Sequence, residues 1–199
     1  MSRFPAFTLR LPDWIETLLP NPDQVYPTVE DRMRLVIELS RLNVQHGTGG
    51  PFGAGVFDRA SGKLLAPGVN LVLPSQCSVA HAEIVAFMMA QPLVGTFDLA
   101  TPGFPPYELV ASTEPCAMCF GSVPWSGVES LVCGARDEDA RAIGFDEGPK
   151  MPNWVAELEK RGIQVQRDVL REDAAAVLHL YAQSGPIYNP KRESGDSEQ

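Results

Sequence analysis

Cysteines and long apolar runs are both scarce in this chain of 199 residues, which has only four cysteines. No stretch comes near the run of about 18 apolar residues that a membrane-spanning helix needs. Segment 1–20 has no continuous apolar core, because Pro5, Arg10, Pro12 and Asp13 interrupt it, so a secretory signal is not expected. We therefore expect a cytoplasmic protein, without membrane contact, whose cysteines stay reduced rather than paired in disulfides.

Positive charge is also scarce. The 16 lysines and arginines face 25 acidic residues, which gives a net charge of −9. A field of this sign repels phosphate backbones and disfavours a nucleic-acid partner. The apolar fraction of 44% and the charged fraction of 21% are ordinary for a globular protein, so we expect one domain with terminal extensions.

The hydrophobic pattern predicts a domain over 28–188 in which strands alternate with helices. Thr28 is a suitable N-cap for a first helix whose apolar residues recur at helical spacing, and two strands joined by a turn follow. Further strands, each followed by a helix, are predicted at 107–113, 130–136 and 163–170. The alternation predicts an α/β sandwich with a mixed sheet, preceded by an extension, 1–27, and followed by a polar tail, 189–199.

The stretch STEPCAMCFG, 112–121, carries two cysteines three residues apart. Pro115 suits the first turn of a helix, which places Cys116 and Cys119 on one face near the positive end of the helix dipole. That position favours the thiolate, which serves a metal ligand or a redox dithiol equally well. The cysteine pair alone therefore leaves both alternatives open.

His81 and Glu83 open an apolar run that predicts a buried helix. Taken singly, His81 suits a hydrogen-bonded core histidine, and Glu83 suits a carboxylate in the first turn of a helix. Followed by Pro-Cys-x-x-Cys, with Cys116 lying 35 residues after His81, they form the H-x-E…P-C-x-x-C pattern of zinc-dependent base deaminases. The pattern predicts one Zn²⁺ per chain, held by His81, Cys116 and Cys119.

This ligand set explains the residue types. Two thiolates and one neutral imidazole neutralise Zn²⁺ and leave its fourth position for a water, which the metal activates as a hydroxide nucleophile. Glu83 does not ligate the metal and can carry the protons. A fourth ligand from Cys77 would instead make a structural zinc module, a non-catalytic interaction domain, but that alternative gives Glu83 no role. Cys133 lies in an apolar strand and suits the core.

Residues 28–188 resemble the cytidine deaminase-like superfamily, and within it the guanine deaminase group. The resemblance is carried by GGPFGAGVF, by GVNLV, by HAEI with EPCAMCFGSVPWSGV, and by AIGFDEGP at 142–149. It implies a three-layer α/β/α sandwich with a five-stranded mixed sheet, a homodimer, and hydrolysis of guanine to xanthine and ammonia. The last stretch favours the guanine deaminase group, because tRNA-adenosine deaminases lack its Gly-Phe-Asp with a second acid. That acid, Glu147, would be a second proton shuttle.

The resemblance also implies a set of substrate-binding residues. Asn70 would hydrogen-bond the purine, and Phe52 would stack on the base opposite the zinc histidine. The backbone N–H of Ala82 would face the substrate carbonyl. Trp125, after the second zinc-ligand helix, and Tyr188, in a C-terminal segment that closes the pocket, complete the set.

The chain departs from the family pattern at two places. Cys77 to Ala80 stand where the family has Asp-Pro-Thr-Ala, and the second acid is Glu147 rather than aspartate. These departures leave other amino-heterocycles, such as an aminotriazine or cytosine, and an adenosine in tRNA as alternative substrates. The net charge of −9 argues against the tRNA.

Overall fold

The computed structural model describes residues 3 and 6–189. Of the predicted tail, 189–199, only Asn189 is among the described residues. A five-stranded mixed sheet in the order β2-β1-β3-β4-β5 lies at the centre. β1 is antiparallel to β2 and to β3, and β3, β4 and β5 are parallel. The strands are β1 (Gly53–Asp58), β2 (Leu64–Val69), β3 (Tyr107–Thr113), β4 (Ser130–Ala135) and β5 (Gln164–Gln166).

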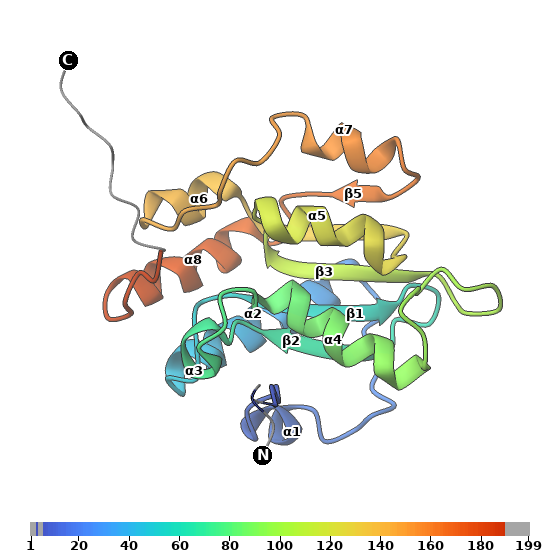
Figure 1. The fold of residues 1–199 in the computed structure, drawn as a ribbon, viewed down its shortest axis with the longest axis horizontal. Coiled ribbons are helices and arrows are strands. Elements are labelled where there is room, and N and C mark those ends of the chain that lie inside the picture. Colours follow the sequence, from blue (N-terminus) through green and yellow to red (C-terminus); the bar gives the residue numbers. More distant parts are fainter. Residues whose placement is uncertain (1–2, 4–5, 190–199) are drawn as a thin grey trace.

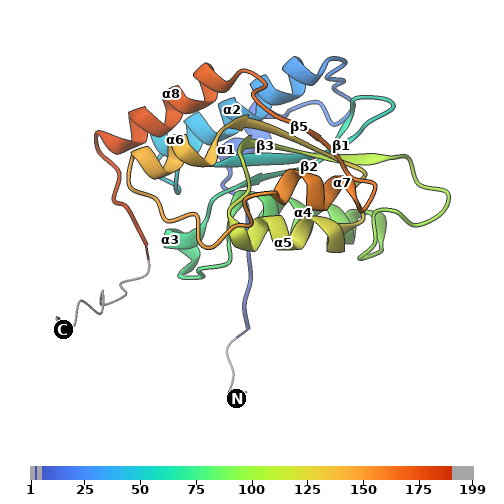
Figure 2. The ribbon, with the colours of Figure 1, turned by 90° about the horizontal axis from the view of Figure 1, so that it is seen from above.

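Helices cover both faces of the sheet, as Figure 1 and Figure 2 show. One layer contains α2 (Val29–Gln45), α6 (Asp137–Ala142) and α8 (Arg171–Ala182), and the other contains α4 (Ala82–Val94), α5 (Ala117–Ser126) and α7 (Trp154–Glu159). Two short helices are α1 (Trp14–Leu18) and α3 (Val72–Ser75). The predicted three-layer sandwich with a mixed five-stranded sheet is confirmed. Within the described part of the chain, no helix has the length and apolarity required to span a bilayer.

Side chains of the central strands alternate between the two layers. Leu109 and Leu131 pack in the core shared with α4 and α5, while Val110 and Val132 pack in the core shared with α2. All seven residues of β3 and all six of β4 are buried, as expected for strands that helices cover on both faces. The apolar runs of these strands therefore decide the layering.

The edge strands are less regular than the central ones. β2 forms one edge and carries Pro67, whose partner in β1 is Gly55. β5 forms the other edge and has only three residues, where the pattern predicts a strand over 163–170. The strand ends early because Asp168 and Leu170 have positive φ angles of 64° and 51°, which turn the chain out of the sheet and into α8.

The N-terminal extension packs on the domain. Ile15 of α1 is 3% exposed and belongs to the core beneath α2. The indole of Trp14 donates to the Thr48 hydroxyl at 3.0 Å and stacks on His46 with ring centroids 5.5 Å apart. α2 then begins at the predicted N-cap Thr28, in a capping box that satisfies two free backbone donors.

Candidate active site

Two helices begin side by side at one end of the sheet because of the strand directions. β2 and β3 are both antiparallel to β1, so they run in the same direction. β2 leads through α3 to α4, and β3 leads to α5, so α4 and α5 start at the same end of the sheet. His81 is the N-cap of α4, and Cys116 is the N-cap of α5. The prediction that Pro115 stands in the first helical turn is wrong by two positions, because Cys116 keeps an extended backbone and its Sγ accepts from the backbone N–H of Cys119 at 3.5 Å.

The three residues predicted to hold zinc lie together. Nδ1 of His81 is 3.5 Å from Sγ of Cys116 and 3.5 Å from Sγ of Cys119, and the three donor atoms lie within 4.8 Å of one another. Zinc bonds of about 2.0–2.1 Å to nitrogen and about 2.3 Å to sulfur, at a tetrahedral angle, place two such donors about 3.5 Å apart. The donor set therefore fits Zn²⁺. Cys77 is not in this group and packs beside the core of α2.

Glu83 and Glu147 are two buried carboxyls at this site. Glu83, in the first turn of α4, is 7% exposed, and Glu147, in the loop between α6 and α7, is 6% exposed. Burial, followed by the negative charge of Cys116, raises the pKa of Glu83 above its ordinary range. Burial, with the charges of Cys116 and Glu83, raises the pKa of Glu147 to about 8. A pKa of about 8 suits Glu147 to hold a proton near neutral pH.

A cavity of about 330 Å³ opens above these groups. Small-molecule sites have volumes of about 300–1,000 Å³, so this cavity suits a ligand at the small end of that range. Its walls include seven of the ten predicted site residues: Phe52, Asn70, His81, Glu83, Cys116, Glu147 and Tyr188. Residues from four distant parts of the sequence are thus brought to one pocket.

Asn70 and Phe52 form one wall of this pocket. β2 ends at Val69, and Asn70 stands in the turn that leads to α3. Its backbone N–H donates to the carbonyl of Phe52 at 3.0 Å, and its Oδ1 accepts from the N–H of Val72 at 3.3 Å. The ring of Phe52 packs edge-to-face on Phe145 with centroids 5.0 Å apart.

Tyr188 lines the pocket from the C-terminal segment. Its ring packs edge-to-face on Phe145 at a centroid distance of 5.1 Å. Its hydroxyl is buried and has no hydrogen-bond partner among the described residues. Gly50 makes room for it, since a Cβ there would lie 1.9 Å from the Tyr188 hydroxyl oxygen. The close approach of these two segments therefore requires glycine at position 50.

The other two predicted substrate-binding residues are Ala82 and Trp125. Ala82 is the first residue of α4 and is fully buried, and the N–H of a first helical residue has no acceptor within its own helix. Trp125 is 84% exposed and borders a different hollow, beside Phe120 and Met151. It stands nine residues after Cys116, which at about 1.5 Å per residue is about 13 Å along the helix. The structure does not bring Trp125 to the pocket.

Sequence reasoning missed residues that build the rim of the pocket. Asn189 accepts from the backbone N–H of Asp146 at 2.9 Å and donates to the carbonyl of Gly144 at 2.7 Å. It therefore ties the segment of Tyr188 to the loop of Glu147. Phe145 packs against the rings of Phe52 and Tyr188, which both line the pocket. Its position within AIGFDEGP is the sequence signal that could have identified it.

Comparison with known proteins agrees with this geometry. Residues 27–135 match the family model of the cytidine and deoxycytidylate deaminase zinc-binding region. The structure of guanine deaminase from Nitrosomonas europaea has a TM-score of 0.85 at 48% identity, covering 92% of this chain and 98% of that one. The complex of NE0047 with 2,6-diaminopurine has a TM-score of 0.87 at 50% identity, covering 92% and 97%.

Curated sequences give a similar result. The guanine deaminase of Bacillus subtilis is 33% identical over 118 residues, which are 59% of this chain and 71% of that protein. A tRNA-specific adenosine deaminase, that of Haemophilus influenzae, is 32% identical over 77% of this chain and 83% of its own. Relatives that act on a base and on a nucleoside in tRNA thus share the zinc-site region.

This fold brings one imidazole, two thiols and a buried carboxyl together at the pocket. That set of groups defines a zinc-dependent aminohydrolase, which replaces an amino group with the oxygen of water. The family match spans more than half of the sequence. The chain belongs to the cytidine and deoxycytidylate deaminase family, and the predicted enzyme class and zinc cofactor are confirmed.

Proposed function

We propose that this protein deaminates guanine to xanthine and ammonia. The observation that carries the proposal is the second buried acid, Glu147, which lines the same cavity as Glu83. A cavity of about 330 Å³ suits a single heterocycle rather than a polynucleotide. The names of the N. europaea and B. subtilis relatives and the purine bound to NE0047 support the same substrate.

Two carboxyls divide the proton transfers that guanine hydrolysis requires. When bound, Zn²⁺ supplies an activated water as the nucleophile for C2. Glu83 takes a proton from that water and delivers it to N3 of the ring. Glu147 donates a proton to the amino group on C2, and this group then leaves as ammonia. The proton of the hydroxyl left on C2 passes to Glu147, which restores its acid form. One water is consumed and one ammonia is released in each turnover.

The remaining pocket residues orient the base. Because Oδ1 of Asn70 accepts from Val72, its Nδ2 is the group available to a purine acceptor. Phe52 offers an aromatic face for stacking, and the N–H of Ala82 lies at a helix N-terminus, which favours an electron-rich carbonyl oxygen. Tyr188 closes the pocket over the base. Trp125 has no part in this mechanism.

We also propose that the protein acts as a homodimer. Large apolar side chains remain exposed on α4 and α5 or just beyond them, with Leu93 at 68%, Phe97 at 80% and Trp125 at 84% exposure. Exposed apolar patches of this kind are typical of protein interfaces. The double variant Leu93→Asp with Trp125→Asp should sediment as a monomer where the natural chain sediments as a dimer, and a natural chain that sediments as a monomer would contradict the proposal.

The proposed setting is purine metabolism in the cytoplasm. Cys116 and Cys119 must be reduced to ligate a metal, and the cytoplasm keeps thiols in that state. Fractionation of cells that produce the protein would test the location, and a secreted product would contradict it.

A substrate panel tests the activity. Zinc-loaded protein is incubated with guanine, adenine, cytosine, their nucleosides, aminotriazines and tRNA, and the ammonia released is measured. We expect the highest kcat/KM with guanine. Preferential release from cytosine, an aminotriazine or tRNA adenosine, with little from guanine, would overturn the guanine assignment while leaving the enzyme class in place.

A further inference from the structure

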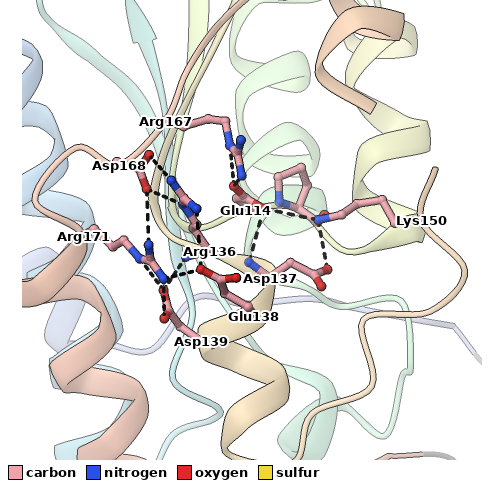
Figure 3. A network of polar contacts seen from close by, with 10 residues as sticks. Glu114, Arg136, Asp137, Glu138, Asp139, Lys150, Arg167, Asp168 and Arg171 are labelled. Carbon is pink, nitrogen blue, oxygen red and sulfur yellow. Dashed lines mark hydrogen bonds and ion pairs between the residues drawn. The ribbon is translucent and has the colours of Figure 1, made fainter. Parts of the chain in front are cut away.

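A network of charged side chains (Figure 3) adjoins the pocket, which one of its members, Glu114, lines. It joins the end of β3, the start of α6, the loop 145–150 and the turn between β5 and α8. Its acids are Glu114, Asp137, Glu138, Asp139 and Asp168, and its bases are Arg136, Lys150, Arg167 and Arg171.

Lys150 is the most buried base of this network, with 6% of its side chain exposed. Its ammonium donates to the carbonyl oxygen of Pro115 at 3.0 Å and lies 3.0 Å from Oδ1 of Asp137 and 3.6 Å from Oε2 of Glu114. It also lies 5.0 Å from the centre of the Trp154 ring. One ammonium thus links the loop 145–150 to the β3–α5 junction and to α6.

Glu147 lies three residues before Lys150 in the same loop. Its carbonyl accepts from the N–H of Ala117 at 2.9 Å, and the carbonyl of Gly148 accepts from Arg141 at 3.0 Å. Gly148 has a φ of 68°, which turns the chain between the acid and the lysine. The loop is therefore anchored at Glu147 and at the residue after it, while the Glu147 side chain lines the cavity.

The pocket itself works against this placement. Glu147 shares the cavity with Glu83 and with Cys116 and is 6% exposed, so holding its carboxyl there costs the hydration of a polar group. That desolvation cost favours withdrawal of the loop toward water. A restraint is needed, and the ammonium of Lys150 supplies one at the point where the loop crosses the start of α5.

We propose that Lys150 is a positioning residue for catalysis, which holds the loop so that the Glu147 carboxyl stays over the pocket. The inference rests on the proposed role of Glu147 as a proton shuttle. Lys150 does not line the cavity, so we expect its effect to fall on proton transfer rather than on binding.

The test is Lys150→Met, which keeps an unbranched side chain of similar length and removes the ammonium that lies over Trp154. Glu114 keeps its contact with Arg167 at 2.6 Å, and Asp137 keeps Arg141 at 2.5 Å, so neither acid is left without a partner. We expect kcat for guanine to fall about 10- to 100-fold, as for small misplacements of a catalytic group, with little change in KM, zinc content or Tm. The matched control is Lys160→Met, which removes a lysine that is 66% exposed and should leave kcat unchanged.

A double-mutant cycle separates positioning from general destabilisation. If Lys150 acts through Glu147, then adding Lys150→Met to Glu147→Gln lowers kcat little further, whereas independent effects would multiply. Should Lys150→Met fail to fold, Lys150→Gln, which keeps a donor for the Pro115 carbonyl, carries the same cycle.

Three results would overturn the inference. Natural kcat in the folded Lys150→Met protein removes Lys150 from catalysis. Multiplied losses in the double variant, with Glu147→Gln impaired alone, remove only the link to Glu147 and leave the proposed function standing. Natural kcat in Glu147→Gln removes the shuttle itself, and the positioning role falls with it.

Discussion

The floor and the rim of the pocket are built in different ways. The floor residues His81, Glu83 and Cys116 stand at the beginnings of two helices, which the central sheet places. The rim residues Glu147 and Tyr188 stand on segments outside the strands and helices. A metal site needs ligands in constant geometry, whereas a closed pocket must open for substrate and product. Helix termini hold the metal ligands in constant geometry, and loops let the pocket open.

The rim is held by side chains rather than by regular backbone hydrogen bonds. Lys150 ties one loop to the start of α5, and Asn189 ties the C-terminal segment to that loop. Each tie can break without unfolding the sheet. We therefore expect substitutions in the floor and in the rim to differ in the size of their effects and in whether they change turnover or binding.

The largest effect is expected in the floor, from Glu83→Ala. The variant should keep zinc, because the three ligands remain, and lose about 10⁴-fold in kcat, the upper end of what an acid–base group contributes. Metal analysis and guanine turnover measure the two properties. Glu30→Ala is the control, since Glu30 is an exposed acid in the first turn of α2. Near-natural turnover in Glu83→Ala would make Glu83 a structural residue.

The next effect belongs to the rim. Glu147→Gln keeps the shape of the side chain but has no proton to donate, so kcat for guanine should fall about 10²–10³-fold, with zinc retained. Steady-state kinetics beside Glu129→Gln, an exposed acid outside the pocket, isolates the proton transfer. If the two variants turned over guanine equally well, Glu147 would have no part in proton transfer, and the chemistry would belong to the floor alone.

The pH profile sharpens the same comparison. Because burial raises the pKa of Glu147 to about 8, the acid keeps its proton below that pH and loses it above. We expect kcat to be level toward neutral pH and to fall about tenfold per pH unit above about pH 8. Glu147→Gln should lack this alkaline limb. An identical limb in the variant would assign the titration to another group.

The smallest effect is expected from Asn189→Ala, which removes two hydrogen bonds between the rim segments. At about 0.5 kcal/mol each for exposed bonds, their loss should lower kcat/KM about three- to tenfold, mainly through KM. Asn21→Ala removes an exposed asparagine whose side chain bonds only within its own turn and is the control. Unchanged kcat/KM in Asn189→Ala would show that the rim segments close independently.

The sequence predicted the floor well because its information is local. The spacing His-x-Glu and Cys-x-x-Cys places each pair within one helical turn, and the alternation of strands with helices implied that the two turns meet. The strand of 163–170 was overestimated, because the positive φ angles at Asp168 and Leu170 leave no mark in the hydrophobic pattern.

The rim was predicted only through resemblance, and only in part. Lys150 donates to a carbonyl 35 residues away, and Asn189 accepts from a backbone N–H 43 residues away. Contacts between residues this far apart leave no mark in the hydrophobic periodicity of the sequence. Trp125 was assigned to the pocket because it follows the zinc helix in sequence. The length of that helix carries it away from the pocket.

Pro67 has a consequence for how copies of this protein meet. An apolar edge strand such as β2, with the sequence LLAPGV, is a ready template for sheet extension between molecules, and aggregation follows from it. Proline offers no N–H at the middle of that edge, and β5, at the opposite edge, is only three residues long. Neither edge supports a long intermolecular ladder, so a concentrated solution of the protein should resist fibril formation, and association is left to the helical faces.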